Sequence, residues 1–346
     1  MVIPGFDDNI NIKGWAAALA LFFFTAAAYF NAPKGDFIWD DKGLIFNDWA
    51  VQQGGLLKYF EPSYLKSVPM EARGRFRPMR AFFFGLDYRL YGQKPAGYHV
   101  TNLLLHFSCS LLLFFLALKL GLPGPAALFA ALLFAVHPAH TESVTWIKNR
   151  SDLIAAFFVL ASFYSFLSRR DLLAALLFLP ALLAKEIALC YPVVLGLFML
   201  NSGEEKPAAY GRRLLPFALM AGLFLLLTSV YWRKEGELAF TPDAQDHFQM
   251  IMVSLGFYVK LLFAPWPLKA EHEFEPPFLW GDPYLLAGLA SAGLIGLLWI
   301  RFRKSPYSFC AFSIFACLLP VLNLHYLPTR LIAEQRVYLA SVFFCL

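Results

Sequence analysis

The sequence predicts an all-α polytopic membrane protein with about ten transmembrane or re-entrant helices and a long first outer loop that carries interfacial helices. Composition is the first reason: 59% of the residues are hydrophobic, 15% are charged, and the mean hydropathy is +0.56. A soluble globular chain has about 25% charged and 45–50% apolar residues. The second reason is the recurrence of apolar runs close to the roughly 20 residues that cross a bilayer. The net charge of +5 fits contact with a lipid bilayer or with phosphate better than contact with nucleic acid.

The expected membrane helices follow the apolar runs in order. The first run, 14–31, is preceded by Asp7 and Asp8 rather than by basic residues, which predicts a retained anchor instead of a cleaved signal peptide. The other runs lie at 98–118, 123–136, 151–168, 172–184, 187–200, 214–232, 247–264, 284–300 and 307–324.

Basic residues in short loops predict the orientation of these helices. Arg169–Arg170, the 201–213 loop and Arg301–Lys304 carry the Lys and Arg residues that favour the cytoplasmic side. This places segments 32–97 and 137–150 on the outer side.

One helix breaks the alternation of sides. Either 247–264 is a re-entrant or interfacial helix, or the short runs within 172–200 form a single span. The last apolar run, from Tyr338, is too short to cross hydrocarbon, so it lies at the interface or the chain is a piece of a longer protein, which we favour. We expect residues 1–346 to form one membrane domain.

An acidic pair, Asp40 and Asp41, stands at the head of the first outer loop, directly after the first membrane helix. Ionisable side chains beside a bilayer are candidates for function, and this placement suggests chemistry on a membrane-embedded substrate. Alternatively the pair caps a helix that starts near Lys42. Further along the loop, Met79–Leu90 has an aromatic face and predicts an interfacial helix.

Four arginines, Arg73, Arg75, Arg77 and Arg80, lie close together in the same loop. They either reach lipid headgroups as interfacial side chains or clamp a phosphate, which guanidinium groups bind in bidentate geometry.

The histidines His137 and His140, with Glu142, form another polar group on the outer side. These residue types can bind a divalent metal, but a hydrogen-bonded interfacial cluster is an equal alternative.

Other polar residues have a structural and a functional alternative. Arg150 and Asp152 open the 151–168 helix, where Ser151 or Asp152 could cap it. Lys185 and Glu186 either neutralise each other in a tight turn or line an outer cavity. His99 lies at the start of a predicted helix and is a further candidate. Glu334 and Arg336 are two more, with a simple surface ion pair as the structural alternative. The five cysteines lie in apolar stretches without CxxC spacing, which predicts buried free thiols.

Several motifs resemble one family in order. FIWDDKGLIFND, FRPMRAFFFGLDYRLYGQKPAGYHVTNLLLH, LFAVHPAHTESVTWIKNRSDLIAAFF, LLAKE and AEQRVYLASVFFC resemble the membrane half of the transmembrane and tetratricopeptide-repeat O-mannosyltransferases and their bacterial relatives, within the GT-C superfamily. The tetratricopeptide repeats are absent here, and Gln335 separates two residues that are typically adjacent in the family. The family's motif residues correspond to Asp40, Asp41, His137, His140, Glu142, Arg150, Asp152, Lys185, Glu186, Glu334 and Arg336.

The resemblance implies a GT-C-like fold and an inverting glycosyltransferase of the bacterial inner membrane, with a periplasm-facing site. The donor would be a mannose-like sugar on a polyprenyl phosphate, and the acceptor a hydroxyl of a protein or glycan. Phosphate leaves without a proton, so one carboxylate base suffices. We assign Asp40 as this base and Asp41 to orientation. The residues expected to hold the phosphate are Arg75, Arg77, Arg150 and Lys185.

Two other functions remain open. One is a transferase that acts on a lipid or glycan rather than a protein. The other is a transporter or flippase for a lipid-linked sugar, which would predict ionisable residues at mid-membrane and repeated halves. No cofactor is certain: a divalent metal at His137, His140 and Glu142 is possible, although transfer without a metal is favoured.

Overall fold

The structure is a computed structural model that describes residues 13–53, 55–61, 77–203, 207–232, 243–272, 278–302, 304–322 and 332–346. These residues fold into helices and loops, with no strand in any of the described ranges, which agrees with the predicted all-α class. The chain separates into two compact units. Unit 1 is Met1–His137 with Thr141–Ala188, and unit 2 is Pro138–His140 with Leu189–Leu346. The assignment of residues 1–346 to one domain stays a prediction.

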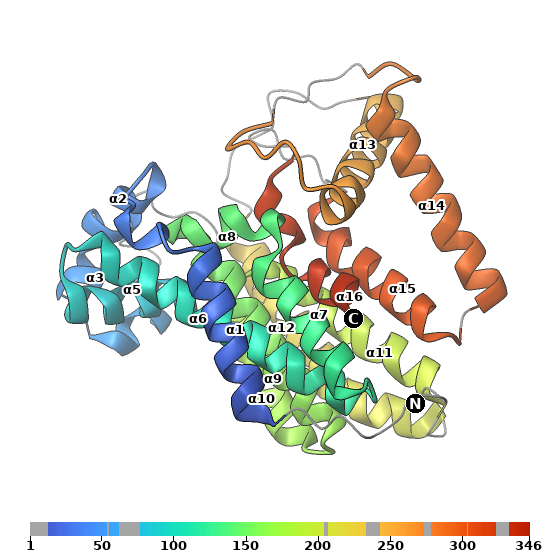
Figure 1. Ribbon diagram of the computed structural model, residues 1–346, viewed down its shortest axis with the longest axis horizontal. Helices are drawn as coiled ribbons and strands as arrows, with labels where there is room; N and C mark the ends of the chain where they lie inside the picture. Colours follow the sequence, from blue (N-terminus) through green and yellow to red (C-terminus); the bar gives the residue numbers. More distant parts are fainter. Residues whose placement is uncertain are drawn as a thin grey trace. The chain divides into compact units, whose positions relative to one another are not determined.

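Unit 1 is built around long apolar helices that lie side by side (Figure 1). Proline residues at their first turns fix where two of them begin, because proline fits the free N-terminal end of a helix. These helices reproduce the first five predicted spans: α1 (Gly14–Ala28), α6 (Pro95–Lys119), α7 (Gly124–Val136), α9 (Arg150–Leu167) and α10 (Asp171–Ala184).

The loop between α1 and α6 and the segment before α9 form short helices. The predicted helix at Met79–Leu90 is confirmed as α5 (Pro78–Tyr91). Before it come η1 (Ala32–Lys34), α2 (Asp40–Phe46), α3 (Trp49–Gln53) and η2 (Leu56–Phe60), and later come η3 (Pro138–His140), α8 (Thr141–Thr145) and η4 (Ile147–Asn149).

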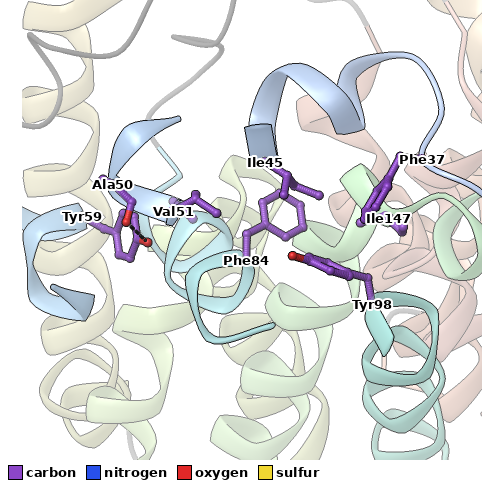
Figure 2. Close-up of a cluster of buried hydrophobic side chains, with 9 residues drawn as sticks. Phe37, Ile45, Ala50, Val51, Tyr59, Phe84, Tyr98 and Ile147 are labelled. Carbon is purple, nitrogen blue, oxygen red and sulfur yellow. Dashed lines mark hydrogen bonds between the residues drawn. The ribbon is translucent and has the colours of Figure 1, made fainter. Parts of the chain in front are cut away.

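A hydrophobic cluster supports α2 from below. Figure 2 shows Ile45 of α2 and Ile147 of η4 with Phe84 of α5 and Tyr98 of α6. Its other members are Phe37, Ala50, Val51, Tyr59 and Ala81. The Tyr59 hydroxyl donates to the Ala50 carbonyl at 2.7 Å, so the polar end of this ring is satisfied inside the cluster. Each large side chain buried here stabilises the loop by about 1.5–3 kcal/mol, which fixes the acidic end of α2 against η4.

Unit 2 contains the remaining long helices. They are α11 (Tyr191–Ser202), α12 (Pro207–Trp232), α13 (Ala244–Phe263), α14 (Pro283–Phe302) and α15 (Pro306–Leu318). Shorter elements are η5 (Glu186–Cys190), where the units divide, and η6 (Leu319–Val321), η7 (Glu334–Val337) and α16 (Ala340–Cys345).

Four of the described helical segments are long and apolar enough to cross a membrane: Pro95–Lys119, Ile147–Leu167, Tyr210–Thr228 and Pro283–Phe302. They support the predicted polytopic membrane protein. The alternative of one continuous helix over 172–200 is wrong, because Lys185 is extended and η5 separates α10 from α11. The five cysteines are free thiols as predicted, and all are buried except the half-buried Cys310.

Two glycines let α13 and α14 approach closely. A Cβ atom at Gly256 would lie 1.9 Å from the Tyr284 carbonyl oxygen, and one at Gly288 would lie 1.9 Å from the Met252 carbonyl oxygen. Both obstacles are backbone atoms, so a rotamer change cannot relieve the clash. The helix pair therefore depends on having no side chain at either position.

Gly256→Ala should destabilise the protein by about 2 kcal/mol or more, because the added methyl forces the two helices apart. Thermal unfolding in detergent micelles measures the effect. Gly293→Ala is the matched control, since a Cβ at Gly293 on α14 meets nothing within 4 Å. The control should leave stability unchanged or raise it by up to about 1 kcal/mol. Equal behaviour of the two variants would contradict close packing at Gly256.

Candidate functional site

The acidic pair lies in the first turn of α2, where its two carboxylates have different surroundings. Asp41 is buried, and each of its oxygens accepts a backbone N–H: Oδ2 from Ile38 at 3.1 Å and Oδ1 from Lys148 at 2.8 Å. Asp41 thus ties the loop between α1 and α6 to η4. The helix starts at Asp40 rather than near Lys42, and its N-cap residue makes no side-chain capping bond.

Asp40 is the accessible member of the pair. Its side chain is 55% exposed and forms an ion pair with the Lys148 ammonium group. That ammonium also lies 4.8 Å from the centre of the Trp146 ring. An exposed ion pair contributes at most about 1 kcal/mol to stability. Breaking the Asp40–Lys148 pair so that each side chain can contact a substrate therefore costs little free energy.

Sequence reasoning missed Lys148. The signal was its place two residues before Arg150, in a segment that had already supplied polar candidates.

Burial raises the pKa of Asp41 to about 6, and the two backbone hydrogen bonds oppose this rise only in part. The carboxylate is therefore a stronger base than an ordinary aspartate, but it is enclosed and both of its oxygens are occupied. A general base must reach the proton that it removes. The geometry favours Asp40 for contact with a substrate and Asp41 for positioning.

Trp39 precedes the pair in a strained conformation. Its φ of 44° and ψ of −118° lie where glycine is normally found, at the first central position of a type II′ turn. Such a conformation costs a residue with a Cβ about 1–3 kcal/mol. The Trp39 side chain is 57% exposed, and its ring meets Trp146 edge to face with the centroids 5.0 Å apart. Strain of this kind persists only where neighbouring contacts impose it, and here the Asp41 bond to Ile38 does so.

Arg150 is fully enclosed beneath this region. Its Nη1 lies 2.6 Å from Asp87 Oδ2, its Nε donates to Asn102 Oδ1 at 2.7 Å, and its Nη2 donates to the Tyr98 carbonyl at 2.8 Å. The Asn102 amide in turn donates to the Val144 carbonyl at 3.1 Å. Arg150 therefore joins α5, α6 and α9, and no part of its side chain is exposed.

Lys185 and Glu186 do not form the local pair considered from sequence. Lys185 Nζ lies 2.6 Å from Asp152 Oδ2 on α9. Glu186 accepts from Arg77 Nη2 at 2.8 and 2.9 Å and from Arg77 Nε at 3.2 Å. Arg77 and Glu186 keep 11% and 15% of their side chains exposed, so this bidentate pair reaches solvent while Lys185 and Asp152 are more deeply buried. Arg73 and Arg75 lie outside the described residues.

Three further candidates, His99, His137 and Glu142, belong to unit 1. His99 is buried on α6, and its Nε2 is 2.9 Å from where a Cβ at Gly35 would stand, so this glycine allows the outer loop to pass over the histidine. His137, at the end of α7, is buried, whereas Glu142 on α8 is half-buried.

Unit 2 holds the other candidates. His140 Nε2 lies 2.7 Å from Ser341 Oγ, and its ring centroid is 4.8 Å from that of Tyr338. Glu334 is buried, so the surface-pair alternative is wrong. Its Oε1 accepts from the Lys269 N–H at 2.7 Å and lies 2.8 Å from His272 Nε2.

Arg336 Nη1 lies 3.4 Å from the Tyr258 hydroxyl, also within unit 2. His272 was missed from sequence, because its partner Glu334 is remote in the chain. Across the described residues, no three His, Cys, Asp or Glu side chains form a group that could hold a metal.

Arg150→Met should destabilise the protein by about 3–5 kcal/mol, because it leaves Asp87 buried without its counter-charge. Asp87→Leu combined with Arg150→Met removes both charges and should recover a large part of that loss. Chemical or thermal unfolding in detergent measures both variants. A double variant as unstable as the single one would contradict an ion pair whose main role is structural.

Asp41→Asn should change the pH dependence of stability. Because the pKa of Asp41 is raised from 3.8 to about 6, its contribution to stability is fully present below about pH 4 and is lost as pH rises through 6. The change corresponds to about 3 kcal/mol between those limits. Unfolding free energies measured from pH 4 to 7 should therefore fall more steeply in the wild type than in Asp41→Asn. Parallel curves would contradict the raised pKa.

Comparison with known proteins finds similarity to protein O-mannosyl-transferases. Protein O-mannosyl-transferase Tmtc1 of Drosophila melanogaster is 32% identical over 352 residues, which cover 86% of this chain and 40% of that protein. Human protein O-mannosyl-transferase TMTC3 is 34% identical over 161 residues, covering 46% of this chain and 17% of the relative. Human TMTC4 is 38% identical over 151 residues, covering 38% and 20%.

No family model and no solved structure matches the chain. The chain spans less than half the length of the curated relatives described above. The resemblance found from the sequence motifs is confirmed: the chain is similar to the TMTC protein O-mannosyl-transferases, and to one of them over 86% of its own length.

Proposed function

We propose that this chain is the membrane part of an inverting glycosyltransferase with a GT-C-like fold. It moves a mannose-like sugar from a polyprenyl phosphate to a hydroxyl group of a protein or glycan. The names of the relatives support sugar transfer, since each is a protein O-mannosyl-transferase. The four apolar helices support a reaction at a membrane, where a polyprenyl donor resides.

The observation that carries the proposal is the difference between the two carboxylates of α2. Asp40 is exposed and forms an ion pair with the partly exposed Lys148, whereas Asp41 is enclosed and bonded to two backbone N–H groups. One carboxylate is thus free to meet a substrate on a scaffold that the other holds in place. Two acidic residues that only capped a helix would not need one exposed and one enclosed carboxylate.

The reaction needs one base and a means of holding charge. Asp40 accepts the proton of the acceptor hydroxyl while that oxygen attacks the anomeric carbon of the donor sugar. The bond from the anomeric carbon to the phosphate oxygen breaks, and its electron pair leaves with the polyprenyl phosphate. Attack from the face opposite the phosphate inverts the anomeric centre. Unlike a glycoside hydrolase, the enzyme does not have to protonate the leaving group.

Among the described residues, Lys148 is our first candidate to receive the departing phosphate. It lies beside Asp40 and is 29% exposed, so a phosphate can replace the carboxylate as its partner. Arg77 is a second candidate, because its pair with Glu186 is partly exposed and its guanidinium can bind phosphate in the same bidentate way. We assign Arg150 and Lys185 to the framework, since their charges are buried and already paired.

We place the reaction on the outer face of a bacterial inner membrane, following the distribution of basic loops. The proposed mechanism works without a resident metal, because Lys148 and Arg77 can balance the phosphate charge. His137, His140 and Glu142 do not form a metal-binding group among the described residues. Transfer abolished by a chelator and restored by one divalent ion would contradict a mechanism without a metal.

Asp40→Asn should reduce turnover by on the order of 10²–10⁴, the usual contribution of a positioned general base, with little change in stability. Transfer of radiolabelled mannose from a polyprenyl-phosphate donor by purified protein measures it. Asp36→Asn is the matched control, because Asp36 is an exposed aspartate of the same loop. Asp41→Asn should reduce turnover less than Asp40→Asn.

Several outcomes would contradict the assignment. Near-normal turnover in Asp40→Asn with an inactive, folded Asp41→Asn would exchange the two roles. Activity in both variants would remove the pair from the chemistry. Movement of the lipid-linked sugar across a vesicle membrane by wild-type protein, without cleavage of the donor, would favour a flippase.

A further inference from the structure

We propose that the exposed indole of Trp39 is the surface on which the sugar ring of the donor stacks, beside Asp40. This inference rests on the proposed function, and it adds a specificity-determining residue and a sugar subsite to it. Three observations lead to it: the strained backbone of Trp39, the orientation of its ring against Trp146, and its place between the membrane helix and the exposed carboxylate.

The backbone is the first observation. Among the described residues, only Trp39 and Arg169 adopt a positive φ without being glycine. A large aromatic residue is a poor choice for such a position, where glycine would be free of strain. The strain is maintained by Asp41, which bonds to Ile38 on one side of Trp39 and to Lys148 on the other side of the site. The result is an indole that remains 57% exposed one residue before Asp40.

The neighbours of the ring are the second observation. Trp146 supports Trp39 edge to face, with an interplanar angle of 74°, and so leaves the Trp39 ring as the exposed member of the pair. Lys148 lies over the Trp146 ring and pairs with Asp40. The Trp146 indole N–H is buried and finds no hydrogen-bond acceptor within the described part of the chain. An aromatic face, a carboxylate and a cation therefore lie within one small region.

This combination matches a sugar phosphate. The C–H groups on one side of a hexose ring form an apolar face, which packs against the electron-rich face of an aromatic ring. Binding sites combine such apolar surface with a few placed polar groups. With the sugar on Trp39, its anomeric carbon can lie near Asp40. Lys148, once released from Asp40, can follow the phosphate on the opposite face of the anomeric carbon, as in-line attack requires.

A membrane anchor is the competing explanation, since tryptophan is common at membrane interfaces. An anchor needs an exposed ring but no strained backbone. Trp49, on α3 of the same loop, provides the comparison: it is 43% exposed and has a lysine, Lys58, 5.2 Å above its ring, yet its backbone is helical. The strain thus distinguishes Trp39 from an ordinary exposed tryptophan nearby.

The test measures binding of two soluble probes to the full purified chain: mannosyl-phosphoryl-citronellol and citronellyl phosphate without sugar. Trp39→Gly removes both the ring and the backbone strain, so it should unfold at the same temperature as the wild type or a higher one. It should bind the mannosylated probe about ten-fold more weakly and the unglycosylated probe equally well. Trp39→Phe should recover most of the loss, and Trp49→Leu should bind both probes as the wild type does.

Each other outcome overturns a stated part of the inference. Equal weakening for both probes would make Trp39 a lipid or interface contact, and no weakening for either would remove it from the donor site. Wild-type protein that binds the mannosylated probe in a Trp39-dependent way without transferring mannose would sustain the subsite and contradict the proposed reaction. Wild-type protein that binds neither probe would overturn both.

Discussion

The arrangement around α2 depends on one carboxylate that makes no contact with solvent. Asp41 accepts the N–H of Ile38 with one oxygen and that of Lys148 with the other. These two bonds join the start of the loop between α1 and α6 to the short segment before α9, far along the chain. They hold Trp39 in its strained conformation, leave Asp40 exposed, and bring Lys148 beside it. Burial of the Asp41 carboxylate disfavours its charged form, and this is why its pKa is raised.

The buried charges below this region work as a framework because each has a partner from a different helix. Arg150 meets Asp87 of α5, and Lys185 meets Asp152 of α9. Removing one member of such a pair is far more costly than removing both, because an isolated charge remains in an apolar interior. The polar motif residues thus divide into an exposed group fit for chemistry and an enclosed group that fixes the helices.

The sequence predicted the long helices well because each is a continuous apolar run, which needs no knowledge of its neighbours; α6, α9 and α14 match their predicted spans closely. The division at Lys185 was predicted from the separate apolar runs 172–184 and 187–200. The pairing of Lys185 with Asp152 could not be predicted, because adjacency in sequence favoured Glu186 as the partner. Asp40 and Asp41 were identified from their place in the chain. The strain at Trp39 and the role of Lys148 depend on a contact between residues more than a hundred positions apart, which no local pattern contains.

The charged start of α9 also has a consequence for how the protein is made. Arg150 depends on Asp87 and Asn102, which are synthesised before it, whereas Asp152 depends on Lys185, which follows at the end of α10. A helix that entered lipid alone with these groups would carry charges whose insertion is costly. The charges at the start of α9 are therefore all paired only once α10 is also in place, which favours insertion of the two helices as one hairpin.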